Sequence, residues 1–172
     1  NYERNSMPSA AETADTYFGA VGRQDLAAMA ASWKPGATSD IIGLANLTAP
    51  DGVIAWFTEL FEAFPDFALV VKKVIADEGS AAVHWSATAT FNGTGTFEGF
   101  KPNGATIDIE GIDIITVEDG LITSLVALQN GLELARQLGV VPPAGSAADK
   151  AMAAAINAKT AATHQIRKLR DR

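Results

Sequence analysis

The segment from Thr48 to Phe67 constrains the fold more than any other part of the chain. Its apolar residues recur every three or four positions, which is the spacing of one helical face, and they are Val53, Trp56, Phe57, Leu60, Phe61 and Phe64. Thr48 with Asp51 predicts a capping box at the start of this helix. Pro65 ends it, because the residue before a proline is pushed out of the α region. The sequence that follows is strand-like, so a sheet must take up the apolar face of the helix.

The strand-like part divides into four segments, which are residues 67–76, 81–91, 105–117 and 121–128. Each is rich in Val, Ile, Thr or Phe, and turn residues separate them. Short turns between long strands favour antiparallel hairpins. The predicted core of the fold is therefore a meander of four antiparallel strands.

Two further helices are predicted before this meander. Ser9 and Glu12 form a second capping-box pattern and open a helix to about residue 21, and Asp25 can cap a short helix to about Trp33. A brief strand is expected over residues 38–42. The predicted class is α+β: a cone-shaped, curved antiparallel sheet with three N-terminal helices enclosing an apolar pocket, plus a C-terminal helix.

The chain divides into three parts by composition. Residues 1–8 are an N-terminal extension, residues 9–141 form the α+β domain, and residues 142–172 are a Pro-rich linker and an Ala-rich helix. Residues 1–145 hold 7 Lys and Arg against 18 Asp and Glu, whereas residues 146–172 hold 6 against 2. This acidic body argues against nucleic acid as a partner.

Composition excludes several other classes of function. The chain has no cysteine, so disulfides and thiolate chemistry are excluded. No metal site is expected, because two distant histidines without paired carboxylates at helical spacing form no ligand set. No apolar run reaches the roughly 20 residues that span a bilayer, and the N-terminus has no basic-then-apolar signal. We expect no membrane association and a cytoplasmic protein.

Asp113 is the first candidate for chemistry, because it lies in a strand of isoleucines. Burying a carboxylate raises its pKa, which is how a base that titrates near neutrality is made. The alternative is that Asp113 faces solvent on the convex side of the sheet.

His84 and Ser86 share the polar face of another strand, which either lines a pocket or meets solvent. Asp40, on the first strand, either reaches the pocket mouth or serves in a turn.

The aromatic residues of the helices are candidates for the pocket wall. A conical pocket is lined by residues that also belong to the core. We therefore expect some of the following to bind substrate as well as to pack: Tyr17, Trp33, Trp56, Phe57 and Phe61.

Five motifs occur in order along the chain: Trp33-Lys34-Pro35-Gly36, Phe64-Pro65-Asp66, Gly111-Ile112-Asp113-Ile114, Val117 to Ile122, and Gln137-Leu138-Gly139. Their order and spacing resemble the SnoaL-like polyketide cyclase family of the nuclear transport factor 2-like superfamily, over about residues 9 to 140. The resemblance implies a cone around a deep apolar pocket, frequent dimerisation, and acid/base chemistry on small hydrophobic ligands without a cofactor.

The last strand departs from the family pattern. The family usually has an aromatic residue or His near Leu125 and Val126 and an acid near Asn130. An Asn cannot carry a proton at neutral pH, although it can donate to a developing oxyanion. Proton transfer must then rest on another residue or be absent.

Together with these residues, the resemblance implies a cofactor-independent acid/base enzyme of cyclase, isomerase or epoxide hydrolase type, acting on a hydrophobic oxygenated molecule such as a polyketide or steroid. Asp113 would carry the proton, while His84 and Asn130 would hold the substrate oxygen. One alternative is a binding protein of the same fold that has lost the family's acid, and another is a scaffold dimer. A homodimer through the outer sheet face is expected, because large exposed apolar patches are rare on monomers.

Overall fold

The computed structural model describes residues 7–170, so most of the predicted N-terminal extension lies outside the described residues. The described helices are α1 (Ala10–Gly22), α2 (Leu26–Ala31), α3 (Asp51–Ala63), α4 (Gly131–Gln137) and α5 (Ala147–Arg170). The strands are β1 (Trp33–Ile41), β2 (Ala45–Thr48), β3 (Ala68–Ala76), β4 (Ser80–Thr90), β5 (Thr106–Glu118) and β6 (Leu121–Gln129). The predicted α+β class is confirmed.

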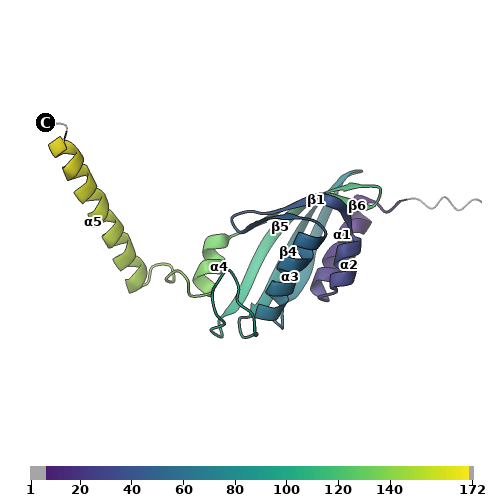
Figure 1. Ribbon diagram of the computed structural model, residues 1–172, viewed down its shortest axis with the longest axis horizontal. Coiled ribbons are helices and arrows are strands. Elements are labelled where there is room, and N and C mark those ends of the chain that lie inside the picture. Colours follow the sequence, from purple (N-terminus) through teal and green to yellow (C-terminus); the bar gives the residue numbers. More distant parts are fainter. Residues whose placement is uncertain (1–6, 171–172) are drawn as a thin grey trace, which may run out of the picture.

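The six strands form one curved, open sheet in the order β2-β1-β6-β5-β4-β3 (Figure 1). Strands β3 to β6 are the predicted antiparallel meander. Strand β6, however, pairs in parallel with β1, with Ser39 beside Leu125. The sheet is therefore mixed, and the prediction of a wholly antiparallel sheet is wrong at this one pairing. Strands β1 and β6 are far apart in the sequence, and no turn connects them that would indicate whether they pair in parallel or antiparallel.

Helices α1 and α3 lie over one face of the sheet, and α2 packs against both of them (Figure 1). The predicted box at the start of α1 is confirmed, because Glu12 N donates to Ser9 Oγ (3.2 Å) and Ser9 N donates to Glu12 Oε2 (2.8 Å). The box predicted for α3 is wrong. Thr48 belongs to β2 and pairs with Thr38, and α3 begins after Pro50 without a side-chain cap.

One boundary differs from the sequence prediction, and two elements were not predicted. The second helix ends at Ala31, because Trp33 already begins β1. Strand β2 and helix α4 were not predicted; both are short, and short elements leave little periodicity in the sequence. Helix α4 follows β6 directly and places Leu134 against the core.

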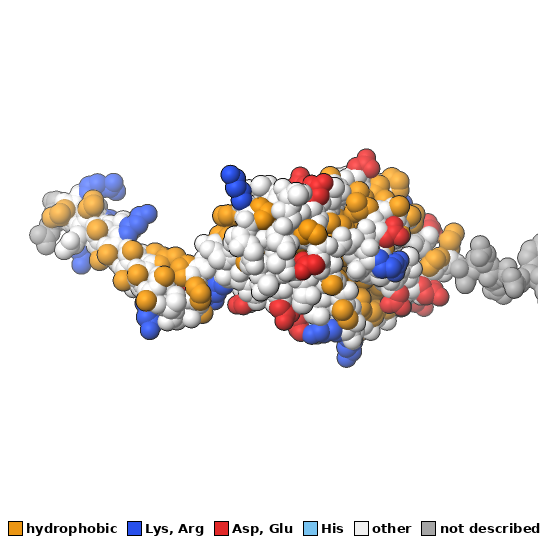
Figure 2. Space-filling model, turned by 90° about the horizontal axis from the view of Figure 1, so that it is seen from below, with side chains coloured by type: hydrophobic (Ala, Val, Ile, Leu, Met, Phe, Trp, Pro, Cys, Tyr) orange, Lys and Arg blue, Asp and Glu red, His pale blue; other side chains and the backbone are white. Residues whose placement is uncertain are grey.

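Helix α5 projects away from the body of the molecule and has no buried residue (Figure 1). Figure 2 shows apolar side chains along it, interspersed with Lys and Arg. Among residues 7–170, no helix has both the length and the apolar character needed to cross a membrane.

Candidate functional site

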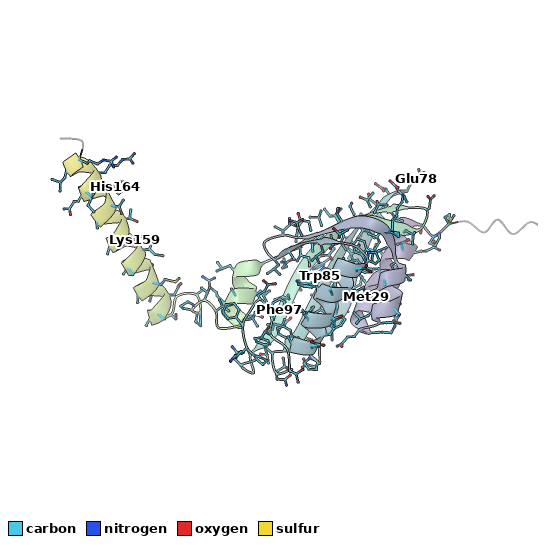
Figure 3. The ribbon with its side chains drawn as sticks, viewed as in Figure 1. Met29, Glu78, Trp85, Phe97, Lys159 and His164 are labelled. Atoms are coloured by element: carbon cyan, nitrogen blue, oxygen red, sulfur yellow. The ribbon has the colours of Figure 1, made fainter. Side chains whose placement is uncertain are left out.

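A cavity of about 100 Å³ lies between α1, α3 and the concave face of the sheet. One water molecule needs roughly 10–15 Å³ of such space, so the cavity has room for a small ligand. Its wall is mainly apolar and is lined by Tyr17, Phe18, Val21, Ser39, Ile41, Leu44, Trp56, Phe57, Leu60, Phe64, Phe67, Leu69, Trp85, Ala87, Phe97, Ile107, Ile109, Asp113, Leu125, Ala127, Gln129 and Leu134. In Figure 3, Trp85 is labelled on the sheet behind α3, and Phe97 below it in the loop between β4 and β5.

The alternation of β5 turns Asp113 into this cavity. Successive side chains of a strand point to opposite faces, so Asp113 shares the inner face with Ile109 and Ile115, whereas Asp108 and Glu110 are exposed on the outer face. Only 7% of the surface of Asp113 is exposed. Burial raises the pKa of its carboxyl group to about 7, against a smaller lowering by a hydrogen bond from Trp85. In that bond Trp85 Nε1 donates to Asp113 Oδ1 at 2.8 Å.

Tyr17 of α1 lines the same cavity. Its burial, and then the negative charge of Asp113, raise the pKa of Tyr17 above its usual range. The phenol therefore stays protonated and acts as a hydrogen-bond donor. Trp33 packs against the ring of Tyr17, with the two ring centroids 5.5 Å apart in an edge-to-face arrangement.

The remaining polar residues of the wall are uncharged. Ser39 comes from β1, and Gln129 comes from the end of β6, where its Nε2 donates to the carbonyl of Ile42 at 3.3 Å. No Lys, Arg or His lines the cavity within the described residues. In the same part of the chain, no group of three or more His, Asp or Glu side chains could hold a metal ion.

Four of the ten predicted site residues line the cavity: Asp113, Tyr17, Trp56 and Phe57. Two more are buried beside it without lining it. Trp33 packs on Tyr17, and Phe61 packs on Phe57 with ring centroids 5.6 Å apart.

The other four predicted residues lie elsewhere. His84 and Ser86 alternate with the buried residues of β4 and point to its outer face, where His84 Nε2 is 3.1 Å from Glu110 Oε2. Asp40 alternates in the same way with Ser39 on β1 and does not line the cavity. These placements contradict the predicted roles of His84, Ser86 and Asp40 in the pocket.

Asn130 has a structural role instead of the predicted catalytic one. It is the exposed N-cap of α4, and its Oδ1 accepts a hydrogen bond from Glu133 N at 3.1 Å. It does not line the cavity, so the prediction that it holds the substrate oxygen is contradicted. A polar residue directly before a short helix is a capping signal, and this signal was available in the sequence.

Sequence reasoning missed Trp85, Ser39, Gln129, Phe97 and Leu134 as cavity residues. The signal for Gln129 was its two-residue spacing from Ala127 and Leu125, which places all three on the same face of β6. The signal for Ser39 was the same spacing from Ile41 on β1. Both signals become useful only once the inner face of the sheet is known.

Together these groups suit the movement of a proton within an apolar enclosure. A carboxyl group with a pKa near 7 is present in both protonation states at neutral pH, so it can remove a proton from carbon and give it back. A neutral phenol nearby can donate a hydrogen bond to an oxygen on which charge develops.

Comparisons with known proteins agree with this architecture. The sequence model of the SnoaL-like domain matches residues 14–125. No curated protein matches the sequence. The structure is similar to AclR from Streptomyces galilaeus, a proposed hydroxylase, with a TM-score of 0.68 and 23% identity over 93% of this chain and 98% of that one.

Two other solved structures share the fold. A proposed SnoaL-like polyketide cyclase from Jannaschia sp. CCS1 has a TM-score of 0.69 and 23% identity, covering 83% of this chain and 100% of its own. An epoxide hydrolase of the LEH-like type from M. tuberculosis has a TM-score of 0.61 and 11% identity, covering 76% of this chain and 90% of its own. Since the domain match spans well over half of the sequence, the chain belongs to the SnoaL-like domain family.

Proposed function

We propose that the protein is a cofactor-independent acid/base enzyme in which Asp113 carries a proton to and from an apolar, oxygenated small molecule. The observation that carries this proposal is the position of Asp113 in the cavity wall, with a pKa of about 7. Buried carboxyl groups whose pKa approaches the working pH are typical of general acids and bases. The reaction type proposed is cyclisation or isomerisation of a polyketide- or steroid-like molecule, or opening of an epoxide.

Tyr17 is the residue proposed to hold the substrate oxygen, in place of His84 and Asn130. Its hydroxyl stays protonated, and the charge of Asp113 is close enough to raise its pKa. When Asp113 removes a proton from carbon, negative charge moves to the carbonyl oxygen of the substrate. A donor on that oxygen lowers the barrier because it acts where charge develops.

The cavity favours neutral substrates. Its wall offers one titratable carboxyl group and neutral donors, and no cationic side chain among the described residues. A phosphate or carboxylate of the ligand would be desolvated there beside Asp113 without a counter-ion, which is unfavourable. The proposed substrate class is therefore an uncharged ketone, enol or epoxide with an apolar ring system.

The first prediction tests proton transfer with a simple probe, 2-tetralone, which is a neutral bicyclic ketone with exchangeable α-hydrogens. In D2O, the unmodified protein should accelerate exchange of these hydrogens, followed by NMR. Asp113→Asn keeps the shape of the side chain but removes the titrating group, so exchange should slow by about 10² to 10⁴-fold. Binding of the ketone, measured by its NMR line broadening, should change little.

Asp108→Asn is the matched control, because Asp108 lies on the same strand but on its exposed face. It should leave the exchange rate unchanged. If Asp113→Asn exchanges deuterium as fast as the unmodified protein, the acid/base proposal is wrong. The rival proposal, a binding protein of the same fold, predicts ketone binding without accelerated exchange in any variant.

A homodimer through the outer sheet face remains our proposal for assembly. That face exposes Ile112, Ile114 and Leu128, each with 45–46% of its surface accessible. They are neighbours, because Ile112 pairs with Leu128 across β5 and β6. A contiguous apolar patch of this kind favours association.

A further inference from the structure

Trp85 and Gly111 face each other across β4 and β5. They are direct partners in the antiparallel register, and Asp113 lies two residues further along β5 on the same inner face. A Cβ atom at Gly111 would lie 2.3 Å from Cζ2 and 2.7 Å from Cε2 of Trp85. The indole therefore occupies the space that a side chain at position 111 would take.

This arrangement explains how Trp85 reaches Asp113. The directly opposite neighbour of Asp113 on β4 is Val83, not Trp85. The indole must lie diagonally over Gly111 to bring its Nε1 within 2.8 Å of Asp113 Oδ1. Diagonal neighbours on one face of a sheet are within reach of large aromatic side chains.

The hydrogen bond distinguishes the two oxygens of Asp113. An indole N–H can only donate, so the oxygen that it contacts is an acceptor in both protonation states. The carbonyl oxygen of a neutral carboxyl group is a better acceptor than its hydroxyl oxygen, so the bond favours Oδ1 as the carbonyl oxygen and the proton on Oδ2. Oδ2 has no protein hydrogen-bond partner among residues 7–170.

We propose that Trp85 and Gly111 are positioning residues that confine proton transfer by Asp113 to its Oδ2 atom. The proposal deepens the proposed function and rests on Asp113 being the proton carrier. In the forward step, ionised Oδ2 takes a proton from a carbon next to a carbonyl group, and the C–H electron pair moves into an enolate. In the second step, Oδ2–H returns the proton to carbon, and the enolate electrons form the new C–H bond.

A single proton-carrying oxygen has a chemical consequence. The atom that removes the proton is already in place to return it, so the carboxyl group need not rotate between the two steps. The bound proton can then move from one carbon of the ligand to another without passing through water.

The first test measures the pKa of Asp113 by NMR of its ¹³C-labelled carboxyl group, which requires no substrate. Trp85→Phe keeps an aromatic ring but removes the N–H donor. A hydrogen bond to a charged group favours the ionised form, so its loss should raise the pKa of Asp113 by about one unit. Gly111→Ala should raise it in the same direction, because the new methyl group displaces the indole.

Two variants serve as matched controls for this measurement. Trp56→Phe makes the same change at another indole of the cavity wall. Gly79→Ala adds a methyl group where, its two chain neighbours apart, no heavy atom of residues 7–170 lies within 4 Å. Both should leave the pKa of Asp113 near its original value. An unchanged pKa in Trp85→Phe would overturn the proposal, whether or not Gly111→Ala folds.

The second test combines the two substitutions. A methyl group at position 111 would also lie 2.8 Å from Cη2 of Trp85, and Cζ2 and Cη2 belong to the outer part of the indole that a phenyl ring does not reach. Gly111→Ala should therefore lower the thermal midpoint in the unmodified protein but much less in the Trp85→Phe background. Equal losses in both backgrounds would contradict the packing argument.

Exchange of 2-tetralone separates this proposal from the proposed function. In Trp85→Phe, the pH profile of exchange should move to higher pH together with the pKa, while the KM for the ketone changes less than kcat. If Asp113→Asn abolishes exchange but Trp85→Phe alters neither the profile nor kcat, only the positioning proposal fails. If Asp113→Asn has no effect, the proposed function fails, and the pKa measurements still decide whether Trp85 holds Oδ1.

Discussion

At the scale of single residues, the burial of Asp113 affects both the stability of the fold and the ability of this side chain to exchange a proton near neutral pH. Its environment is mainly apolar, with Trp85 as its hydrogen-bond donor within the described residues. Burial favours the neutral form of a carboxyl group, which is the same effect that brings its pKa to about 7. The burial that suits Asp113 to the proposed proton transfer therefore also makes folding sensitive to pH.

The second prediction concerns this sensitivity. Because the pKa of Asp113 rises from 3.8 unfolded to about 7 folded, its favourable contribution is complete below pH 4 and is lost as pH rises to 7. The difference between the two limits is at most on the order of 4 kcal/mol. Asp113→Asn cannot ionise, so its free energy of unfolding should exceed that of the unmodified protein increasingly between pH 5 and pH 8.

Urea unfolding of both proteins at these two pH values gives the comparison. Exposed acids with a lowered pKa, such as Asp66 and Asp77, have the opposite effect at acid pH. They are present in both proteins, so their contribution cancels in the difference. Parallel pH curves for the two proteins would show that Asp113 is not buried as described.

At the scale of elements, the short helix α4 closes part of the cavity. Its residue Leu134 lies in the wall, and its N-terminus depends on the side chain of Asn130. The residue that looked like a replacement for a family acid thus acts on the site through helix capping.

The third prediction tests this capping role. Asn130→Ala removes the acceptor for Glu133 N and should lower the free energy of unfolding by about 1 kcal/mol. Asn130→Asp retains an acceptor and should cost much less. Urea unfolding measures both changes, and in neither variant should the pH profile of 2-tetralone exchange move. A shift of that profile in Asn130→Ala would indicate a direct part in proton transfer.

Elements with a strong local signal could be predicted from the sequence. The capping box at Ser9 and the alternation of β4 and β5 placed α1 and the meander within a few residues of their observed bounds. The β1–β6 pairing could not be predicted, because it joins residues such as Ser39 and Leu125 that no turn connects.

The candidate site was predictable only in part for a related reason. Alternation assigned Asp113 and His84 to definite faces of their strands, but it did not say which face the helices cover. The packing of α1 decides this, and it turns Trp85 and Asp113 inward while His84 turns outward. The Trp85–Gly111 contact depends on strand register, which a single sequence does not reveal.

At the scale of the whole molecule, one side of the sheet has no helix over its apolar residues in the part of the chain that the structure describes. Ile112, Ile114 and Leu128 are exposed there. The body also carries the acidic charge, whereas α5 carries most of the basic residues of the C-terminal segment. A second copy could cover the sheet, and α5 could add contacts of opposite charge.

The fourth prediction follows from this surface. We expect a mass near twice 18.0 kDa at micromolar concentration by light scattering. Ile112→Lys should shift the molecule toward monomers, because it places a charge at the apolar patch. Val140→Lys alters an exposed apolar residue elsewhere and should have no such effect. A chain ending at Gly145 should dimerise less tightly, and a monomeric unmodified protein would refute the proposal.

The largely apolar wall of the cavity has one more consequence. For a ligand, the cavity between α1, α3 and the sheet is an apolar environment with a few polar groups at fixed positions. Each methylene group moved from water into such a medium is worth about 0.8 kcal/mol. Among molecules that fit, oil–water partitioning would thus rank affinity first, and the position of the oxygen relative to Tyr17 and Asp113 would decide which of them react.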